Sequence, residues 1–308
     1  MVDLLIRQLR WEADDIVSVT LADPHGDELP SWEPGAHLDL HTPVGVRQYS
    51  LCGDPRRRDE WRVAVRRAPQ SRGGSQWIHD EARVGGLITV GPPRNSFPLV
   101  AAPSYLFIGG GIGLTPLLPM IGQVARAGLP WTLLYAGRRR TTMAFLDELA
   151  AYGDRVHVRP ADEHGRLDVA AELAGVATDA AVYCCGPAGL ITTVEQHCQD
   201  RPTGSLHVER FEPVAAGAAG DTAFDVELDR SGVTLHVPAD ASILDVIERA
   251  GIAAIGSCYQ GTCGSCETRV LDGRPDHRDS VLSESERIAG ETMMLCVSRA
   301  TSRLVLDL

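Results

Sequence analysis

The sequence predicts a multi-domain α+β protein of 308 residues, with an antiparallel β-barrel first and a doubly wound parallel α/β domain second. Three observations predict this order. Short alternating strands fill residues 1–99, strands and helices alternate over 100–211, and a second group of short strands occupies 223–308. The length also suggests two or three domains. Residues 212–222, rich in alanine and glycine, are expected to be a linker.

The barrel is predicted from strands that are apolar on one face only. HLDLH at 37–41 and EWRVAVRR at 60–67 alternate apolar and polar side chains, as half-buried strands do. Turn signals separate them, including Pro34 followed by Gly35 and the Gly53–Pro55 segment. Regularly interrupted short strands are typical of a closed antiparallel sheet.

The α/β domain is predicted from buried strands that are each followed by a helical pattern. YLFIGG begins at 105 and leads through a glycine loop into a helix that ends at Gly128. Further strands are expected at 131–137, 156–160, 180–186 and 205–211, with helices at 145–153, 167–175 and 187–198. This alternation predicts a parallel sheet with helices on both faces.

The last segment is predicted to contain two strands and one helix before a cysteine-rich loop. The strands are FDVELD at 224–229 and VTLHVP at 233–238. Ile243, Val246, Ile247 and Ala250 share one face of the helix, and Gly251 is its expected cap.

Charge and hydropathy exclude some functions. The formal charge is −12, which argues against nucleic acid as a partner, because phosphates require a basic face. We find no apolar run near the roughly 18 residues of a membrane span. The first residues also lack the pattern of a signal peptide, so a cytoplasmic location is expected.

Four cysteines carry the most specific motif. Cys258, Cys263 and Cys266 have the spacing C-x4-C-x2-C, and Cys296 follows at a distance, which is the plant-type pattern of a [2Fe–2S] cluster. Glycines within the loop let backbone amides turn toward the sulfurs. The alternatives are a zinc site or disulfides. Zinc knuckles usually pair two C-x2-C units, and only one is present here. The pattern therefore favours a cluster that carries one electron at a time.

A glycine-rich loop, Gly109–Pro116, lies between a predicted strand and a predicted helix. A helix N-terminus at this place offers free amides to a diphosphate. The loop departs from the G-x-G-x-x-G fingerprint, and the acidic residue expected after the second strand is replaced by Arg138, Arg139 and Arg140. The glycines would alternatively serve only tight packing. The three arginines would bind a 2′-phosphate, or Arg139 and Arg140 would be solvated loop residues.

Two further short motifs lie in the barrel segment. Arg47–Ser50 places a tyrosine, suited to stacking on a ring, beside an arginine, suited to a phosphate. Arg72–Ser75 then opens a predicted helix, where anions bind well. Together the two motifs suggest a site for a flavin phosphate. In the α/β domain, Cys184–Pro187 ends a strand at the carboxyl edge of the sheet, where such folds bind ligands.

Taken together, these motifs resemble the phthalate dioxygenase reductase family over nearly the whole chain. The segments that carry the resemblance are RQYSLCGDP (47–55), RGGS (72–75), PRNSFPL (93–99), GGGIGLTP (109–116), YCCGPAGL (183–190), HVERF (207–211), the four cysteines, PDHRDSVL (275–282), CVSRA (296–300) and LVLDL (304–308). The order of flavin, nicotinamide and ferredoxin domains is also that of the family, which implies a β-grasp fold for 223–308.

The resemblance implies roles for individual residues. It places FMN in the barrel and assigns Ser50, Thr115 and Cys185 to the reacting centre. Ser50 is expected near the reactive flavin nitrogen, Phe211 over the flavin ring and Arg138 near the adenosine ribose. The remaining implied contacts are Arg47, Gln48, Tyr49, Ala64, Val65, Arg66, Gly73, Gly74 and Ser75 for the flavin, and Gly110, Gly111, Gly113, Thr115, Gly186 and Pro187 for the dinucleotide.

The implied function is that of an oxygenase reductase. Hydride would pass from NADH, with NADPH as the alternative, to FMN, and single electrons would pass through the [2Fe–2S] cluster to a terminal Rieske-type oxygenase or demethylase. Acidic residues outnumber arginines over 223–308, so transient electrostatic docking of a monomeric reductase is expected. The alternatives are a haem-thiolate monooxygenase as acceptor, or a non-catalytic redox sensor.

Overall fold

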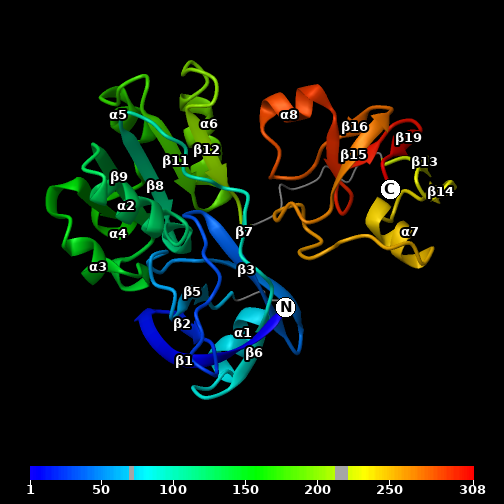
Figure 1. Cartoon of the computed structure of the whole chain (residues 1–308). Helices are drawn as coiled ribbons and strands as arrows, with labels where there is room; N and C mark the ends of the chain where they lie inside the picture. The colour runs from blue at the N-terminus through cyan, green and yellow to red at the C-terminus, as the bar shows by residue number, and fades with distance from the viewer. Residues whose placement is uncertain (69–72, 212–220) are drawn as a thin grey trace. The chain divides into compact units, whose positions relative to one another are not determined.

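The structure is a computed structural model that describes residues 1–68, 73–211 and 221–308 (Figure 1). It contains two compact units, Met1–Glu209 and Arg210–Leu308. The first unit includes both the barrel and the parallel sheet. In the described part of the chain, no helix is long and apolar enough to cross a membrane.

A seven-stranded antiparallel sheet forms the N-terminal part of the first unit. Its strands follow the order β4-β3-β6-β1-β2-β5, and β7 pairs with β3. A bridge between Leu51 and Val63 joins the end of β4 to β5 and closes the sheet. The predicted barrel is thereby confirmed. The elements are β1 (Val2–Ala13), β2 (Ile16–Ala22), β3 (Ala36–Thr42), β4 (Gly45–Ser50), β5 (Trp61–Arg66), α1 (Gly74–Asp80), β6 (Leu87–Val90) and β7 (Arg94–Asn95).

A five-stranded parallel sheet follows, in the order β10-β9-β8-β11-β12. Helices cover both faces: Phe107 and Tyr135 point into one core, and Ile108 and Leu134 into the other. The order is that of a doubly wound sheet, as predicted. The strands are β8 (Tyr105–Gly110), β9 (Trp131–Gly137), β10 (Val156–Pro160), β11 (Ala181–Cys185) and β12 (Leu206–Glu209), and the helices are α2 (Leu117–Arg126), α3 (Leu146–Ala150), α4 (Ala161–His164), α5 (Val169–Ala174) and α6 (Ala188–His197).

One helix is shorter than the sequence predicts. The pattern at 145–153 predicts a continuous helix, but α3 ends at Ala150. Phe145 starts it in the left-handed conformation, and a separate 3₁₀ turn begins at Gly153. Tyr152 packs edge-on against Trp131, with ring centroids 5.1 Å apart. This aromatic contact accompanies the early end of the helix.

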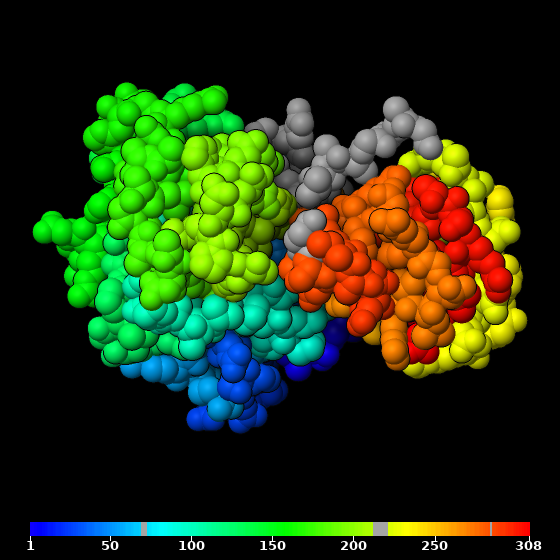
Figure 2. All heavy atoms as spheres, turned by 90° about the horizontal axis from the view of Figure 1, so that it is seen from above, coloured from blue at the N-terminus to red at the C-terminus, as the bar shows by residue number. Residues whose placement is uncertain are grey.

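The second unit contains a five-stranded mixed sheet in the order β14-β13-β19-β15-β17, with α7 packed against β14. Ser242 and Asp245 form a capping box at the start of α7. The elements are β13 (Phe224–Leu228), β14 (Val233–Val237), α7 (Ile243–Arg249), β15 (Glu267–Asp272), β16 (Pro275–Asp276), α8 (Glu284–Ala289), β17 (Thr292–Met294), β18 (Arg299–Ala300) and β19 (Leu304–Leu306). In the space-filling view the atoms of this unit run from yellow through orange to red along the chain (Figure 2). The small α+β third domain is confirmed.

Candidate functional site

Arg47 and the start of α1 lie against each other in the barrel. A Cβ at Gly74 would stand 2.4 Å from Arg47 Cγ, so only glycine lets the arginine lie over this helix start. Arg47 Nη1 donates to the carbonyl of Val46 at 2.7 Å. Gly73 has φ +89, and Ser75 Oγ accepts a hydrogen bond from the amide of Ala68 at 3.2 Å. The structure brings two separate motifs together, while Arg72 lies outside the described residues.

The other residues of β4 are held by the barrel wall. Gln48 Nε2 donates to Asp39 Oδ1 at 2.9 Å, and Arg94 Nη2 donates to the same oxygen at 2.7 Å. Burial raises the pKa of Tyr49 to about 12, so its hydroxyl keeps its proton. The strand therefore holds a neutral aromatic side chain beside the Arg47 cation.

Near the end of β5, the side chains of Ala64 and Val65 point into the protein, so only their backbone is available to a ligand. Ala64 and Val65 point into two hydrophobic cores and are 4% and 0% exposed, whereas Arg66 is exposed. His79 Nε2 lies 3.0 Å from the carbonyl oxygen of Val65. A flavin along this strand would contact Ala64 and Val65 through their main chain.

Most glycines of the loop after β8 serve close packing. A Cβ at Gly113 would stand 2.3 Å from the carbonyl oxygen of Cys185, and one at Gly110 would stand 2.6 Å from Pro187 Cδ. A Cβ at Gly186 would stand 2.9 Å from Gly110 Cα. The loop after β8 and the loop after β11 thus touch backbone to backbone. The close approaches at Gly110 and Gly113 are those that the packing alternative predicts.

Gly111 is different, because it has φ +56 and nothing within 4 Å of its Cβ position. It begins a 3₁₀ turn, Gly111–Leu114, and α2 starts only at Leu117. The sequence predicts a loop leading directly into the helix, and the structure instead inserts this turn. Thr115 is 2% exposed and donates its hydroxyl to the carbonyl of Ile112 at 2.9 Å. At Gly111, therefore, the backbone of the loop faces open space.

Ser50, Cys185 and Glu209 meet where the barrel adjoins the carboxyl edge of the parallel sheet. Ser50 Oγ donates to Glu209 Oε2 at 3.5 Å, and the Cys185 thiol donates to the same oxygen at 3.9 Å. Loss of water raises the pKa of Glu209 to about 8, although both hydrogen bonds oppose the shift. Burial, followed by the charge of Glu209, also raises the pKa of Cys185. At neutral pH the cluster therefore holds a protonated carboxyl and a neutral thiol.

Two predicted residues are not part of this cluster. Arg138 is exposed and directly follows β9. Phe211, 39% exposed, lies beyond Glu209, the last residue of the first unit. It belongs to the second unit, and its expected place over a flavin stays a prediction.

In the second unit, backbone amides point at three of the four predicted cysteine sulfurs. Cys258 Sγ accepts from the amides of Gln260 at 3.3 Å and Thr262 at 3.4 Å. The amide of Gly261 donates to Cys296 Sγ at 3.3 Å, and the amide of Ser265 donates to Cys263 Sγ at 3.4 Å. Tyr259, Gly261 and Gly264 all have positive φ, which turns these amides inward.

The cysteine sulfurs also interact with one another. Contacts among the sulfurs lower the pKa of Cys258 and Cys266 and raise the pKa of their partners Cys263 and Cys296. All four side chains are 5–8% exposed, and all eight cysteines of the chain are free thiols. The alternative of disulfides is therefore wrong. Four buried sulfurs that lie close together among amide donors suit an iron–sulfur cluster.

The comparisons with known proteins agree with this donor set. Residues 226–301 match the family model described as a 2Fe-2S iron-sulfur cluster binding domain. The chain is 46% identical to the phenoxybenzoate dioxygenase subunit beta of Ectopseudomonas oleovorans, covering 100% of this chain and 97% of that protein. It is also 39% identical to the solved structure of phthalate dioxygenase reductase, with a TM-score of 0.73, covering 100% of this chain and 98% of the other. The chain belongs to the phthalate dioxygenase reductase family.

This reductase also resembles part of a longer protein. A type IV self-sufficient cytochrome P450 monooxygenase is 44% identical, with a TM-score of 0.92, and the match covers 99% of this chain and 41% of that one. The reductase thus spans about two fifths of that relative.

Membership settles the general chemistry. The protein is an NAD(P)H-dependent flavin and [2Fe–2S] oxidoreductase, the reductase component of a multicomponent oxygenase system. The family match rules out zinc as the resident group of the four cysteines. Cys258, Cys263, Cys266 and Cys296 would hold the cluster, which stores single electrons when bound.

Glu209 is a site residue that no sequence motif predicts. It stands 159 positions from Ser50 in the chain, so no local motif links the two. The sequence does offer one indication: Glu209 ends the last parallel strand, so it lies at the same sheet edge as Cys185. The two residues pair in register between β11 and β12.

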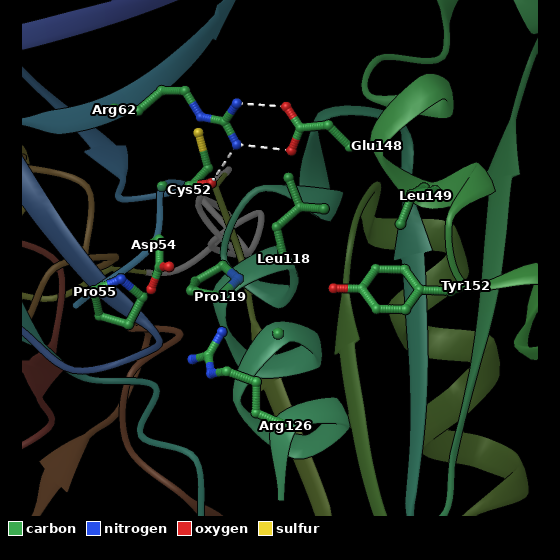
Figure 3. A pocket seen from close by; sticks show the side chains of 12 residues that line it. Cys52, Asp54, Pro55, Arg62, Leu118, Pro119, Arg126, Glu148, Leu149 and Tyr152 are labelled. Carbon is green, nitrogen blue, oxygen red and sulfur yellow. Dashed lines mark hydrogen bonds and ion pairs between the residues drawn. The ribbon is translucent and has the colours of Figure 1, made fainter. Parts of the chain in front are cut away.

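A separate hollow of about 330 Å³ lies in the first unit, lined by residues of the barrel, α2 and α3 (Figure 3). Arg62 on β5 donates to both carboxylate oxygens of Glu148, at 2.5 and 2.9 Å, and to the carbonyl of Cys52 at 2.8 Å. Its guanidinium also lies 5.1 Å from the centre of the Phe145 ring. None of the predicted site residues lines this hollow, and the Arg62–Glu148 pair on its wall joins the barrel to α3.

Proposed function

We propose that this reductase uses FMN, bound in the barrel, to convert hydride from a nicotinamide cofactor into single electrons for an external oxygenase. The observation that carries the proposal is the meeting of Ser50, Cys185 and Glu209, because it joins the predicted flavin strand to the predicted nicotinamide edge. A bound flavin supplies the change from two-electron to one-electron transfer.

Each half of the flavin has its own group of residues. Arg47, with Gly73, Gly74 and Ser75, binds the phosphate, because a forked cation lies directly over a helix start. Tyr49 stacks on the ring, and the main chain of Ala64–Arg66 follows the ribityl chain. We find no further segment that would bind an adenine, which favours FMN over FAD.

Ser50 and Glu209 hold a proton beside the flavin ring. With a pKa of about 8, the Glu209 carboxyl is mostly protonated at pH 7 and can donate to Ser50 Oγ. The serine hydroxyl is then available to a ring nitrogen. Thr115 and Cys185 are proposed to position the nicotinamide, with Gly111 as the open backbone for the diphosphate.

The acceptor is proposed to be a Rieske-type oxygenase or demethylase. Acidic residues outnumber arginines over 223–308, so a basic patch on the oxygenase would dock transiently, with strong dependence on salt. A haem-thiolate oxygenase is the second candidate, favoured by the similarity to the P450 monooxygenase.

Flavin extraction and turnover test the proposal. Heat-released flavin should chromatograph as FMN, and purified protein should reduce cytochrome c rapidly with NADH or NADPH. Reduction of a purified Rieske oxygenase, but not of a purified P450 haem domain, would favour the first acceptor. Slow turnover with every acceptor would contradict the proposal and support the redox sensor. Recovery of FAD would contradict the flavin assignment alone.

A further inference from the structure

Three consecutive arginines follow β9 at the edge of the sheet that carries the glycine loop. Gly110 of β8 pairs with Ala136 of β9, so the two loops leave the same carboxyl edge from neighbouring strands. In doubly wound sheets, an acidic residue after the second strand binds the 2′-hydroxyl of NAD, and an arginine there accommodates the 2′-phosphate of NADP. Arg138, Arg139 and Arg140 occupy this place.

The backbone of this loop is fixed. Thr142 donates its amide and its hydroxyl to the carbonyl of Arg139, at 3.0 and 2.9 Å. A Cβ at Gly137 would stand 2.4 Å from Met143 Cγ, so glycine lets the chain turn tightly over Met143. The three arginines therefore lie on a short, hydrogen-bonded turn rather than on a long loop.

The three arginines differ in what they contact. Arg140 donates to both carboxylate oxygens of Glu163, from Nε at 2.9 Å and from Nη2 at 2.7 Å, which lowers the pKa of that carboxyl. Asp162 also contributes to the field at Arg140. Arg138 and Arg139 are exposed, and among the described residues their side chains have no hydrogen-bond or ion-pair partner. Arg140 thus pairs with Glu163, while Arg138 and Arg139 have no such carboxylate partner.

We propose that Arg138 and Arg139 bind the 2′-phosphate of the adenosine ribose, so that this reductase prefers NADPH. The inference rests on the proposed function and identifies its reductant. Two guanidinium forks match a phosphate dianion in charge and geometry. The turn offers no carboxylate of its own to a ribose diol, and the neighbouring Glu163 is occupied by Arg140. The family resemblance implies NADH, whereas the division of roles among the arginines favours the phosphorylated cofactor.

Ligand binding to the full-length holoenzyme tests the site without turnover. Isothermal titration should show adenosine 2′,5′-bisphosphate binding at least about tenfold more tightly than 5′-AMP, given the strength of charge-assisted hydrogen bonds. Arg138→Ala and Arg139→Ala should each weaken the binding of the bisphosphate by about tenfold and leave the affinity for 5′-AMP unchanged. Arg83→Ala, an exposed arginine in the barrel part of the unit, is the matched control and should change neither.

A variant that is expected to bind the bisphosphate more tightly shows that the losses in the arginine variants are not caused by misfolding. Glu163→Gln removes a negative charge and releases Arg140, so the bisphosphate should bind several-fold more tightly. The ratio of kcat/KM for NADPH to that for NADH should fall in the two arginine variants and rise in Glu163→Gln. Equal affinity for the two nucleotides, or affinities unchanged in Arg138→Ala and Arg139→Ala, would overturn the inference. If neither nicotinamide reduces the flavin while the bisphosphate still binds tightly, the proposed function fails and the phosphate site stands.

Discussion

Ser50, at the end of a barrel strand, donates its hydroxyl to Glu209, at the end of the last parallel strand, over 3.5 Å. This contact joins the two halves of the first unit at the place where the predicted flavin and nicotinamide residues meet. The Glu209 carboxyl also accepts a hydrogen bond from the Cys185 thiol. A protonatable group therefore lies where hydride transfer is proposed.

Glu209→Gln should slow the reduction of the flavin by about tenfold or more, because an amide cannot release a proton to Ser50. Stopped-flow absorbance under anaerobic conditions measures this rate. Wild-type rates should change with an apparent pKa near 8, and those of the variant should lose this dependence. Equal rates and equal pH profiles would exclude a role for the carboxyl.

The same carboxyl should affect stability with a defined sign. Its pKa is raised from 4.5 to about 8 in the folded protein, so the folded state binds more protons than the unfolded state between these values. Stability therefore falls as pH rises through this window. Relative to wild type, Glu209→Gln should gain thermal stability at pH 8 and show little difference below pH 4.5. Differential scanning calorimetry at both pH values provides the comparison.

Gly113→Ala should destabilise the first unit by about 2 kcal/mol, because the new Cβ would overlap the carbonyl oxygen of Cys185 and force backbone to move. Gly189→Ala in α6 is the control, since nothing lies within 4 Å of its Cβ position. That control should be neutral or slightly stabilising. Chemical denaturation of both variants tests the difference, and equal stability would show that the loops do not need close approach.

Arg62 and Glu148 should couple measurably. A double-mutant cycle with Arg62→Met and Glu148→Gln should give a coupling energy of about 1 kcal/mol in unfolding, because the pair is bidentate but partly exposed. The pair Arg57–Asp59, exposed on both sides, is the control and should couple far less. A coupling energy near zero for both pairs would mean that the contact in Figure 3 does not join the barrel to α3.

Ser265→Ala should lower the reduction potential of the cluster by roughly 50 mV, because the hydroxyl lies 3.0 Å from Cys263 Sγ and stabilises negative charge on it. Redox titration followed by electron paramagnetic resonance measures the shift. Ser231→Ala, in the turn after β13, should leave the potential unchanged. A potential that does not respond to Ser265→Ala would indicate that amides alone tune the cluster.

The sequence predicts strands well where a glycine or a proline ends them, as Gly137 and Pro160 do. The bounds of β9 and β10 equal the predicted 131–137 and 156–160, because both strands are followed by clear breaks. The sequence predicts helix ends and site contacts less well where residues distant in the chain determine them. The early end of α3 accompanies the packing of Tyr152 on Trp131, and the closeness of Ser50 and Glu209 depends on the closure of the whole unit. The packing roles of Gly110 and Gly113 likewise appear only when a second loop lies against them.

The central claim is that one chain converts hydride into single electrons on a flavin and a plant-type cluster. Anaerobic titration of the purified protein with NADPH, followed by optical and electron paramagnetic resonance spectra, tests it most directly. The account predicts uptake of about three electrons per chain, two on the flavin and one on the cluster, with a [2Fe–2S] signal that disappears in Cys263→Ser. Uptake of only two electrons without that signal would contradict it.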